Sequence, residues 1–408
     1  MKSWKRILLV AAAVLALVCV ALEITSRAAD SSVGAQRFDP NSLRLMQEKG
    51  QRASLWQKLS IAYLDPGAAK LSDVRTQPHP YLGYVLRPSW HTAEGALQHC
   101  SHNALGFRGK ETTWEKPVGT FRILTLGGSS TYGQTESKDA AVWSQRLEDL
   151  LGERHPAQKI EVVNGGCSGW TSFEMLGQLA YRGLDLSPDL VVVYESVNDM
   201  RAALYTAAEP EPERDNTHWR STWPVDRPSA LERLLEHSRS YLVWRRFFTN
   251  YARERSDLGY YALAGYDPAS TELYCNRSRG GWPDGKVPER GFQNYKRNLE
   301  SLIALAQSHG IKVFVATQAL MEWDFASREC ADVQIASFRK IQGIQREVSR
   351  ALGAALGETG AAIEAEEKRA FDTTGKHLFK NDVHPFDEGS ELIAKTIADE
   401  LVKQKLVP

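Results

Sequence analysis

The chain of 408 residues has room for roughly two to three average domains, or for one large α/β domain with an insertion. Hydrophobic residues make up 42% and charged residues 25% of it, a globular composition that argues against wholesale disorder, collagen-like repeats and a protein with many membrane spans. Basic and acidic residues number 50 each, so the formal net charge is zero. Without a basic excess or tract, we expect no nucleic-acid partner.

The N-terminus has the pattern of an export signal. An uninterrupted apolar run over residues 7–22 follows three basic residues, Lys2, Lys5 and Arg6. The run lies between the length of a signal-peptide core and that of a membrane span of about 20 residues. We interpret residues 1–23 as a signal anchor, a transmembrane segment that leaves the rest of the chain extracytoplasmic, in the periplasm or at the cell surface. The alternative is a signal peptide that is cleaved after Ala28.

Residues 24–118 are expected to form a stalk and a loop-rich extension. The segment is polar and loosely patterned up to about residue 70, with a short helix expected near 55–63, and is then rich in Pro, Gly, His and Trp. The stretch His99-Cys100-Ser101-His102 superficially resembles a metal cluster. Because no second group of ligands follows at a matching spacing, we expect ordinary loop residues there and no metal site.

From Phe121 onward, short apolar segments alternate with helix-like ones. The apolar segments predict strands at 123–126, 160–163, 190–194 and 311–317, with a weaker fifth at 361–365. Helices are expected at 139–151, 292–309 and 387–402. Strands that alternate with helices predict a parallel sheet covered on both faces. We therefore expect one α/β domain over residues 119–406.

Chemistry-bearing residues follow the first three predicted strands. The first strand runs into Gly127-Gly128-Ser129, the second into a Gly-rich loop over 164–169, and the third into 195–199, which contains Asn198. His384 stands just before the last predicted helix. The carboxyl ends of parallel strands meet at one edge of a sheet, where ligands bind. A Ser nucleophile, a His base, an amide and a backbone N–H from a Gly-rich loop together indicate acyl-transfer chemistry.

These segments resemble the sequence blocks of the SGNH (GDSL-like) hydrolases. Gly127-Gly128-Ser129-Ser130-Thr131 resembles block I, with Gly128 where the usual aspartate stands. Asn164-Gly165-Gly166-Cys167-Ser168-Gly169 resembles block II, and Ser196-Val197-Asn198-Asp199 resembles block III with Ser196 in place of its first glycine. Upstream, residues 103–109 resemble a segment that precedes block I in exported members.

The resemblance implies a three-layer α/β/α, flavodoxin-like fold and a serine esterase that needs no metal or organic cofactor. Ser129 would be the nucleophile and His384, which matches the last block Asp-x-x-His, the base. The oxyanion hole would consist of the Ser129 N–H, the Gly169 N–H and the Asn198 side chain.

The acid of the last block departs from the family pattern. Asn381 stands three residues before His384, where the family has aspartate, and Asp382 stands two residues before it. An aspartate orients the histidine and stabilises the imidazolium. We expect Asp382 to take this role. The alternatives are Asn381 as a neutral orienting group, no acid at all, or another carboxylate.

The segment at about 201–290 interrupts the alternation and is interpreted as a cap inserted over the active-site mouth. An amphipathic helix is expected over 229–255, with Leu231, Leu234, Leu235, Tyr241 and Leu242 on one face. In an oxidising compartment we expect Cys275 of this insertion to pair with Cys330, with Cys100 as the rival partner. Cys167 is expected to be a free, buried thiol.

The sequence therefore predicts a membrane-anchored, extracytoplasmic serine hydrolase that cleaves acyl esters on cell-envelope glycans or lipids. One alternative is an O-acyltransferase of envelope polysaccharide that uses the same site. Another is a catalytically weak glycan-binding or assembly protein, which the Asn381 departure favours.

If residues 7–22 span a membrane, the chain should stay with membranes through an alkaline carbonate wash, because the hydrocarbon core retains an apolar run of this length. A C-terminal reporter that works only outside the cytoplasm should be active. As a control, arginines at Leu15 and Leu17 should abolish membrane retention, since each costs about 3 kcal/mol at the centre of a span. Soluble protein with a new N-terminus near Ala29 would contradict the anchor.

Overall fold

The structure is a computed structural model, and it describes residues 23–24, 75–79, 81–92, 98–208, 230–245, 286–287, 289–326 and 330–408. The chain forms two compact units, one of residues 75–223 with 270–408 and one of residues 1–74 with 224–269. The apolar run at 7–22, the helix expected near 55–63 and most of the expected cap lie outside the described residues. Among the residues that are described, no helix has the length and apolarity to cross a membrane.

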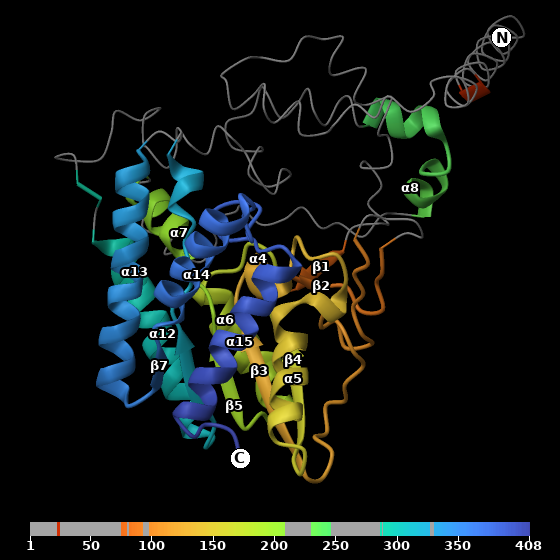
Figure 1. The fold of residues 1–408 in the computed structure, drawn as a ribbon. Coiled ribbons are helices and arrows are strands. Elements are labelled where there is room, and N and C mark those ends of the chain that lie inside the picture. Colours follow the sequence, from red (N-terminus) through yellow and green to blue (C-terminus); the bar gives the residue numbers. More distant parts are fainter. Residues whose placement is uncertain are drawn as a thin grey trace, which may run out of the picture. The chain divides into compact units, whose positions relative to one another are not determined.

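The larger unit is built on a parallel sheet of five strands (Figure 1). The strands are β3 (Thr120–Leu126), β4 (Lys159–Asn164), β5 (Leu190–Val193), β6 (Lys312–Ala316) and β7 (Ala355–Gly357). They lie in the order β4-β3-β5-β6-β7, and every neighbouring pair is parallel. Counted along the chain this is the flavodoxin-like order of doubly wound sheets, which places a switch point between β3 and β5. The predicted α/β class with a parallel sheet is confirmed.

Alternate residues of the central strands enter two separate apolar cores, as the period of a pleated strand requires. Leu124, Val191 and Val313 pack on one face, whereas Ile123, Val192 and Phe314 pack on the other. The first face is covered by α6 (Ser172–Gln178), α7 (Val197–Ala208), α12 (Arg290–Ser308) and α13 (Ala331–Leu352). The second is covered by α5 (Trp143–Arg154), α14 (Thr359–Thr374) and α15 (Asp387–Lys403). The result is a three-layer α/β/α arrangement.

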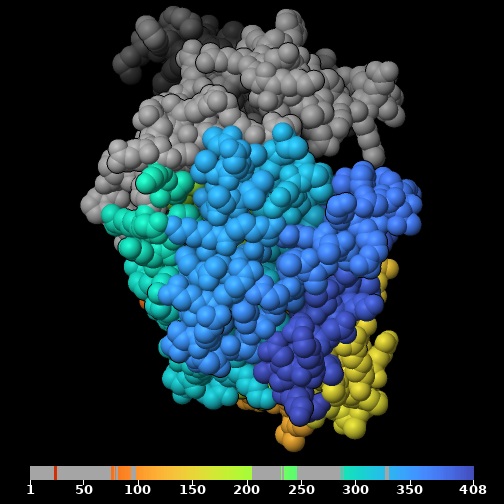
Figure 2. Space-filling view, turned by 60° about the vertical axis from the view of Figure 1, so that its left-hand side comes forward, coloured from red at the N-terminus to blue at the C-terminus, as the bar shows by residue number. Residues whose placement is uncertain are grey.

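The C-terminal helix completes the second face. Figure 2 shows α15 in dark blue alongside α5 in yellow, and α14 also packs against α15. Ile393, Ile397 and Leu401, one helical turn apart, are buried against this side of the sheet. The loop that precedes α15, and with it His384, is thereby fixed at the carboxyl-end edge.

The fifth strand differs from the one expected at 361–365. The strand is β7, and residues 361–365 belong to α14. Thr359, Ile363 and Glu367 are buried at intervals of four residues, which is the helical and not the strand period. The Ala- and Glu-rich composition of this stretch also favours a helix.

The described part of the expected cap is not one continuous helix. Helix α7 runs on to Ala208, and α8 (Ala230–Leu235) ends before a second helical stretch begins at Arg239. The Glu23 carboxylate accepts hydrogen bonds from the Ser238 hydroxyl and the Arg239 N–H, at 2.9 and 3.0 Å. This cap at a new helix N-terminus explains the break. Leu231 and Leu234, expected on an apolar face, are exposed.

The extension before β3 packs into the larger unit from Arg75 onward. Strands β1 (Thr76–His79) and β2 (Gly83–Leu86) form an antiparallel hairpin. The Tyr84 hydroxyl donates a hydrogen bond of 2.7 Å to the Ser168 carbonyl, in the loop after β4. The hairpin therefore supports one of the loops at the carboxyl-end edge.

The described cysteines include one that forms a disulfide and two that do not. Cys330 is disulfide-bonded, whereas Cys100 and Cys167 are buried thiols that form no disulfide. The rival pairing with Cys100 is thus wrong, Cys167 is the buried thiol outside a disulfide that was predicted, and Cys275 lies outside the described residues. The described residues contain no group of three or more His, Cys, Asp or Glu side chains that could hold a metal ion.

Glu136 carries a buried carboxyl that links the loop after α4 (Ser129–Tyr132) to α15. It accepts a 2.8 Å hydrogen bond from the Ser390 hydroxyl and a 3.0 Å bond from the Thr135 N–H. Burial raises its pKa from 4.5 to about 7, although the charge of Arg108 and these hydrogen bonds act in the opposite direction.

Between pH 4.5 and about 7 the folded chain therefore holds this proton more tightly than the unfolded chain, so Glu136 makes the free energy of unfolding fall as the pH rises through that window. In urea unfolding curves, the wild type should lose on the order of 1 kcal/mol per pH unit there relative to Glu136→Gln. The exposed control Glu153→Gln should show no such difference from the wild type. A difference between wild type and Glu136→Gln that does not vary with pH would contradict the assignment.

Candidate active site

Ser129 stands where β3 turns into a helix. The strand ends at Leu126, Gly127 and Gly128 make the turn, and Ser129 is the first residue of α4. Its side chain is nearly buried, with 7% of the residue exposed. The turn thus presents a hydroxyl at the carboxyl end of a strand next to the switch point.

His384 meets Ser129 from the opposite end of the sequence. Its Nε2 lies 2.7 Å from Ser129 Oγ, and its Nδ1 lies 2.8 Å from Asn381 Oδ1. The same Asn381 atom accepts hydrogen bonds from the backbone N–H groups of Val383 and His384, at 3.4 and 3.1 Å. An atom that accepts from two N–H groups is the amide oxygen, so Nδ1 of His384 must carry the proton. Nε2 is then the acceptor for the Ser129 hydroxyl, which is the tautomer that a general base needs.

Asp382 does not take the orienting role expected for it. The hydrogen bond to His384 Nδ1 comes from Asn381, whereas Asp382 Oδ2 forms a 2.8 Å ion pair with Arg201, with both side chains buried. Neighbouring residues of this tight loop point to opposite sides. Asn381 bonds to the backbone of its own turn and to the ring, and Asp382 is buried against Arg201 of α7. The prediction is corrected accordingly: the ring of His384 is hydrogen-bonded to Asn381 and not to Asp382.

The Asn198 side chain lies next to the loop that contains Gly169. The Asn198 side-chain amide donates a 2.9 Å hydrogen bond to the Trp170 carbonyl, one residue after Gly169. An amide carries two N–H protons, so one is left for a substrate oxygen. Gly169 has a φ of 84°, a left-handed conformation that favours glycine. The donor roles of the Gly169 and Ser129 N–H groups stay predictions.

Buried hydrogen bonds lock the loops of Ser129, Asn198 and His384 together. The Ser130 hydroxyl donates to the Val383 carbonyl at 3.0 Å, one residue before His384. Gln318, just after β6, donates from its amide nitrogen to Ser130 Oγ at 3.1 Å, and its amide oxygen accepts from the N–H groups of Ser196 and Val197, both at 2.9 Å. One glutamine therefore spans the nucleophile helix and the loop that carries Asn198.

Arg108 shows what the upstream motif over 103–109 does. Its guanidinium donates hydrogen bonds to the carbonyls of Tyr132 and Gly133, at the C-terminal end of α4. Asp139 accepts a 2.8 Å bond from the Arg108 Nε and keeps the side chain in place. This buried arginine fixes the end of the helix that begins with Ser129.

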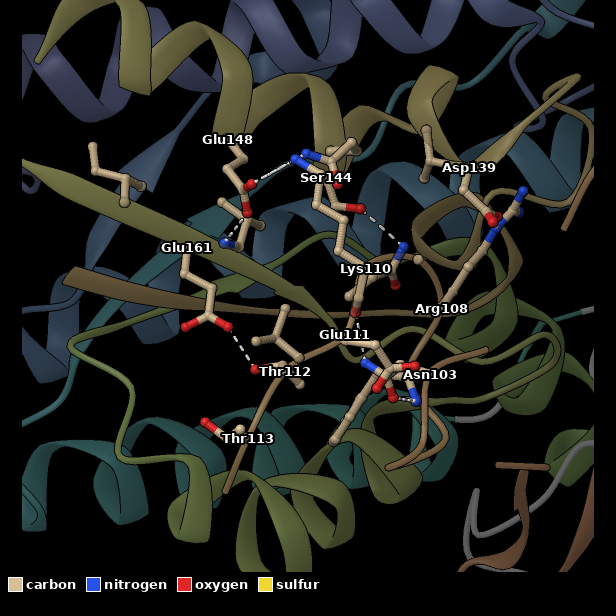
Figure 3. A pocket seen from close by; sticks show the side chains of 18 of the residues that line it. Asn103, Arg108, Lys110, Glu111, Thr112, Thr113, Asp139, Ser144, Glu148 and Glu161 are labelled. Carbon is tan, nitrogen blue, oxygen red and sulfur yellow. Dashed lines mark hydrogen bonds and ion pairs between the residues drawn. The ribbon is translucent and has the colours of Figure 1, made fainter. Parts of the chain in front are cut away.

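A separate cavity of about 430 Å³ lies between residues 103–113, the edge strand β4 and α5 (Figure 3). Its charged walls pair with each other: Lys110 bonds to Glu148 at 2.9 Å, and Arg108 bonds to Asp139. Neither Ser129 nor His384 lines it. We therefore place the candidate site at the hydrogen bond between those two residues and not in this cavity.

Three buried groups of the site were missed at the sequence level: Glu195, Arg201 and Gln318. Glu195 and Gln318 follow predicted strands at the carboxyl-end edge, so their position was a signal that could have been used. Arg201 lies on α7 one turn after Asn198, and its charge beside the apolar Met200, Ala202 and Ala203 was the signal there.

The chain resembles known proteins in sequence and in fold. The sequence model of a family described as GDSL-like Lipase/Acylhydrolase matches residues 125–392. No curated protein matches the chain. Among solved structures, the acetylxylan esterase Axe2 from Geobacillus stearothermophilus is 14% identical with a TM-score of 0.40, covering 70% of this chain and 96% of that one.

Two other solved structures resemble the chain to a similar degree. A putative GDSL-like lipase from Parabacteroides merdae has 14% identity and a TM-score of 0.41, covering 70% of this chain and 96% of its own. LAE5, an α/β hydrolase enzyme from the metagenome of Lake Arreo, Spain, has 14% identity and a TM-score of 0.39, covering 71% of this chain and 97% of its own. At such values we carry nothing about function over from these structures.

The geometry separates the roles of the two neighbouring residues. Asn381→Ala should lower ester turnover by roughly tenfold or more, because the ring loses the group that fixes its tautomer. Asn381→Asp should raise turnover above the wild type, since a carboxylate also stabilises the imidazolium. Both are measured as kcat on p-nitrophenyl acetate.

Asp382→Asn is the matched control. It should chiefly lower the free energy of unfolding, by about 3 kcal/mol, because it removes the charge of the carboxylate that is ion-paired with the buried Arg201. If folded Asp382→Asn protein were inactive while Asn381→Ala kept full activity, the assignment of Asn381 would be wrong.

Proposed function

Because the chain belongs to the GDSL-like lipase/acylhydrolase family, whose model matches residues 125–392, we propose that this ester hydrolase works through Ser129 as nucleophile and His384 as general base. The observation that carries the proposal is the 2.7 Å hydrogen bond between Ser129 Oγ and His384 Nε2, with Asn381 holding the proton on Nδ1. Family membership gives the reaction class, and this hydrogen bond supports Ser129 and His384 as the residues that carry it out.

The first half of the reaction forms an acyl-enzyme. His384 Nε2 takes the Ser129 hydroxyl proton as Oγ attacks the ester carbonyl carbon, and the carbonyl oxygen becomes an oxyanion. The Ser129 N–H, the Gly169 N–H and the Asn198 amide donate hydrogen bonds to that oxygen. The imidazolium then protonates the departing alcohol, and the acyl group stays on Ser129.

The second half releases the acid. A water molecule gives a proton to His384 Nε2 and attacks the acyl carbon, and the same donors hold the second oxyanion. His384 returns the proton to Ser129 Oγ as the carboxylic acid leaves. Asn381 keeps the ring oriented throughout but adds no negative charge, so the imidazolium is stabilised less than beside an aspartate.

The substrates that fit this placement are acyl esters outside the cytoplasm, on glycans or lipids of the cell envelope. Two features support an extracytoplasmic site. The apolar run at 7–22 behind basic residues is typical of an export signal, and Cys330 is disulfide-bonded. The protein is then held at the membrane by that run, with its catalytic domain in the periplasm or at the cell surface.

A fluorophosphonate probe tests the nucleophile. It should label wild-type protein on Ser129, as read by peptide mass spectrometry, because only a serine beside a base reacts readily. Ser129→Ala should lose labelling and lose p-nitrophenyl acetate turnover by roughly 10³-fold or more. The exposed Ser308→Ala variant serves as the control and should behave as wild type.

Unchanged turnover in Ser129→Ala would refute the proposed site. An unlabelled but folded wild type would favour a glycan-binding or assembly protein. Transfer of the acyl group to an added sugar hydroxyl, in preference to water, would assign the same site to an O-acyltransferase.

A further inference from the structure

Glu195 is a fully buried carboxylate that joins the nucleophile loop to the oxyanion loop. It directly follows Tyr194 at the end of β5. One of its oxygens, Oε2, accepts a 2.9 Å hydrogen bond from the Gly128 N–H, the residue before Ser129. The other, Oε1, accepts from the N–H groups of Asn198 at 2.8 Å and Ser196 at 3.1 Å. One side chain thus contacts the backbone on both sides of the reaction centre.

The space beside Gly128 is filled by this carboxylate. A Cβ added at Gly128 would lie 2.4 Å from Glu195 Oε2 and 2.3 Å from Asn198 Nδ2. The first value is about the separation between Cβ and a carboxylate oxygen within one aspartate side chain. Glu195 comes from the end of the neighbouring strand. Its Oε2 therefore lies as close to residue 128 as the carboxylate oxygen of an aspartate at that position would lie to its own Cβ.

We propose that Glu195 is a positioning residue of this site. Its carboxylate binds the Gly128 N–H and the Asn198 N–H, and it thereby fixes Ser129 in position relative to the oxyanion donor Asn198. The inference rests on the proposed function of Ser129. A carboxylate suits the task because it only accepts hydrogen bonds, and bonds to a charged acceptor are stronger than neutral ones. Glu195 touches no reacting atom and acts through the backbone of residues 128 and 198.

The electrostatic surroundings make this acceptor sensitive to pH. Burial raises the pKa of Glu195 to about 7, and the three hydrogen bonds and the charge of Arg201 act against burial. The other titratable groups that face it are Tyr194 before it, Asp199 on α7 and Tyr295 on α12, and burial raises the pKa of each of them as well. Among these residues Arg201 alone is a cation, and it is also ion-paired with Asp382.

Protonation weakens the hold on both loops. A neutral carboxyl carries an O–H donor and has less capacity to accept, so it serves the N–H groups of Gly128, Ser196 and Asn198 less well. The reaction then needs two deprotonated groups, the Glu195 carboxylate, whose pKa is about 7, and the His384 base. The logarithm of the rate should rise with pH with a limiting slope of about two, where a single base would give about one.

The test uses the 408-residue chain with Glu195→Gln, and Glu136→Gln as the matched control. Glu136 is an equally buried carboxyl with a pKa raised to about 7, but it bonds to Ser390 and Thr135, outside the reaction centre. The readouts are fluorophosphonate labelling rates between pH 5 and 8, kcat and KM on p-nitrophenyl acetate, and circular dichroism to verify folding.

In Glu195→Gln, kcat and the labelling rate should fall by roughly 10²-fold, the loss typical of a misplaced catalytic group. KM should stay within about twofold, because ground-state binding is untouched. The limiting slope of log labelling rate against pH should drop from about two to about one. Glu136→Gln should keep the wild-type rate and slope.

Wild-type labelling together with an unchanged Glu195→Gln rate and slope overturns this inference and leaves the proposed function intact. A folded wild type that takes no label overturns the proposed function itself. Should Glu195→Gln fail to fold, the wild-type profile decides: a slope of about two supports the role of Glu195, and a slope of about one overturns it.

Discussion

The hydrogen bond between Ser129 Oγ and His384 Nε2 joins two residues 255 positions apart in the chain, and the rest of the site is arranged around it. Its direction depends on where one proton sits. Asn381 decides this, because its oxygen already accepts two backbone N–H groups and can receive only a donor from the ring. A neutral amide thereby sets the tautomer that a carboxylate sets elsewhere, and gives up only the stabilisation of the imidazolium.

Keeping that bond in place requires polar groups in an apolar interior. Gln318 and the Arg201–Asp382 pair are buried directly beneath the loops, and each has its hydrogen bonds made. Buried polar groups cost stability when unpaired, but a fully paired network fixes one arrangement of the loops. The sheet order supplies the location, since the loops after β3 and β5 meet beside the switch point, where doubly wound sheets place their sites.

Much of the site could be predicted from the sequence because carboxyl ends of parallel strands meet. Ser129 and Asn198 follow that rule, whereas His384 was found from its position just before the last helix. The strand-end rule does not decide between Asn381 and Asp382. Which of these two adjacent residues bonds to the ring depends on the conformation of the turn and not on residue type. Residues 361–365 were ambiguous for another reason: a short apolar run fits a strand or a buried helix face, and packing under α15 selects the helix.

The central claim, that Asn381 fixes the Nδ1–H tautomer of His384, is tested most directly by ¹⁵N nuclear magnetic resonance of histidine-labelled protein. Asn381→Ala identifies the His384 signals. Above the titration of the ring, the account predicts a protonated, pyrrole-type Nδ1 and an unprotonated, pyridine-type Nε2 for His384. A proton found on Nε2 in the resting protein would leave Ser129 facing a donor and would contradict the account.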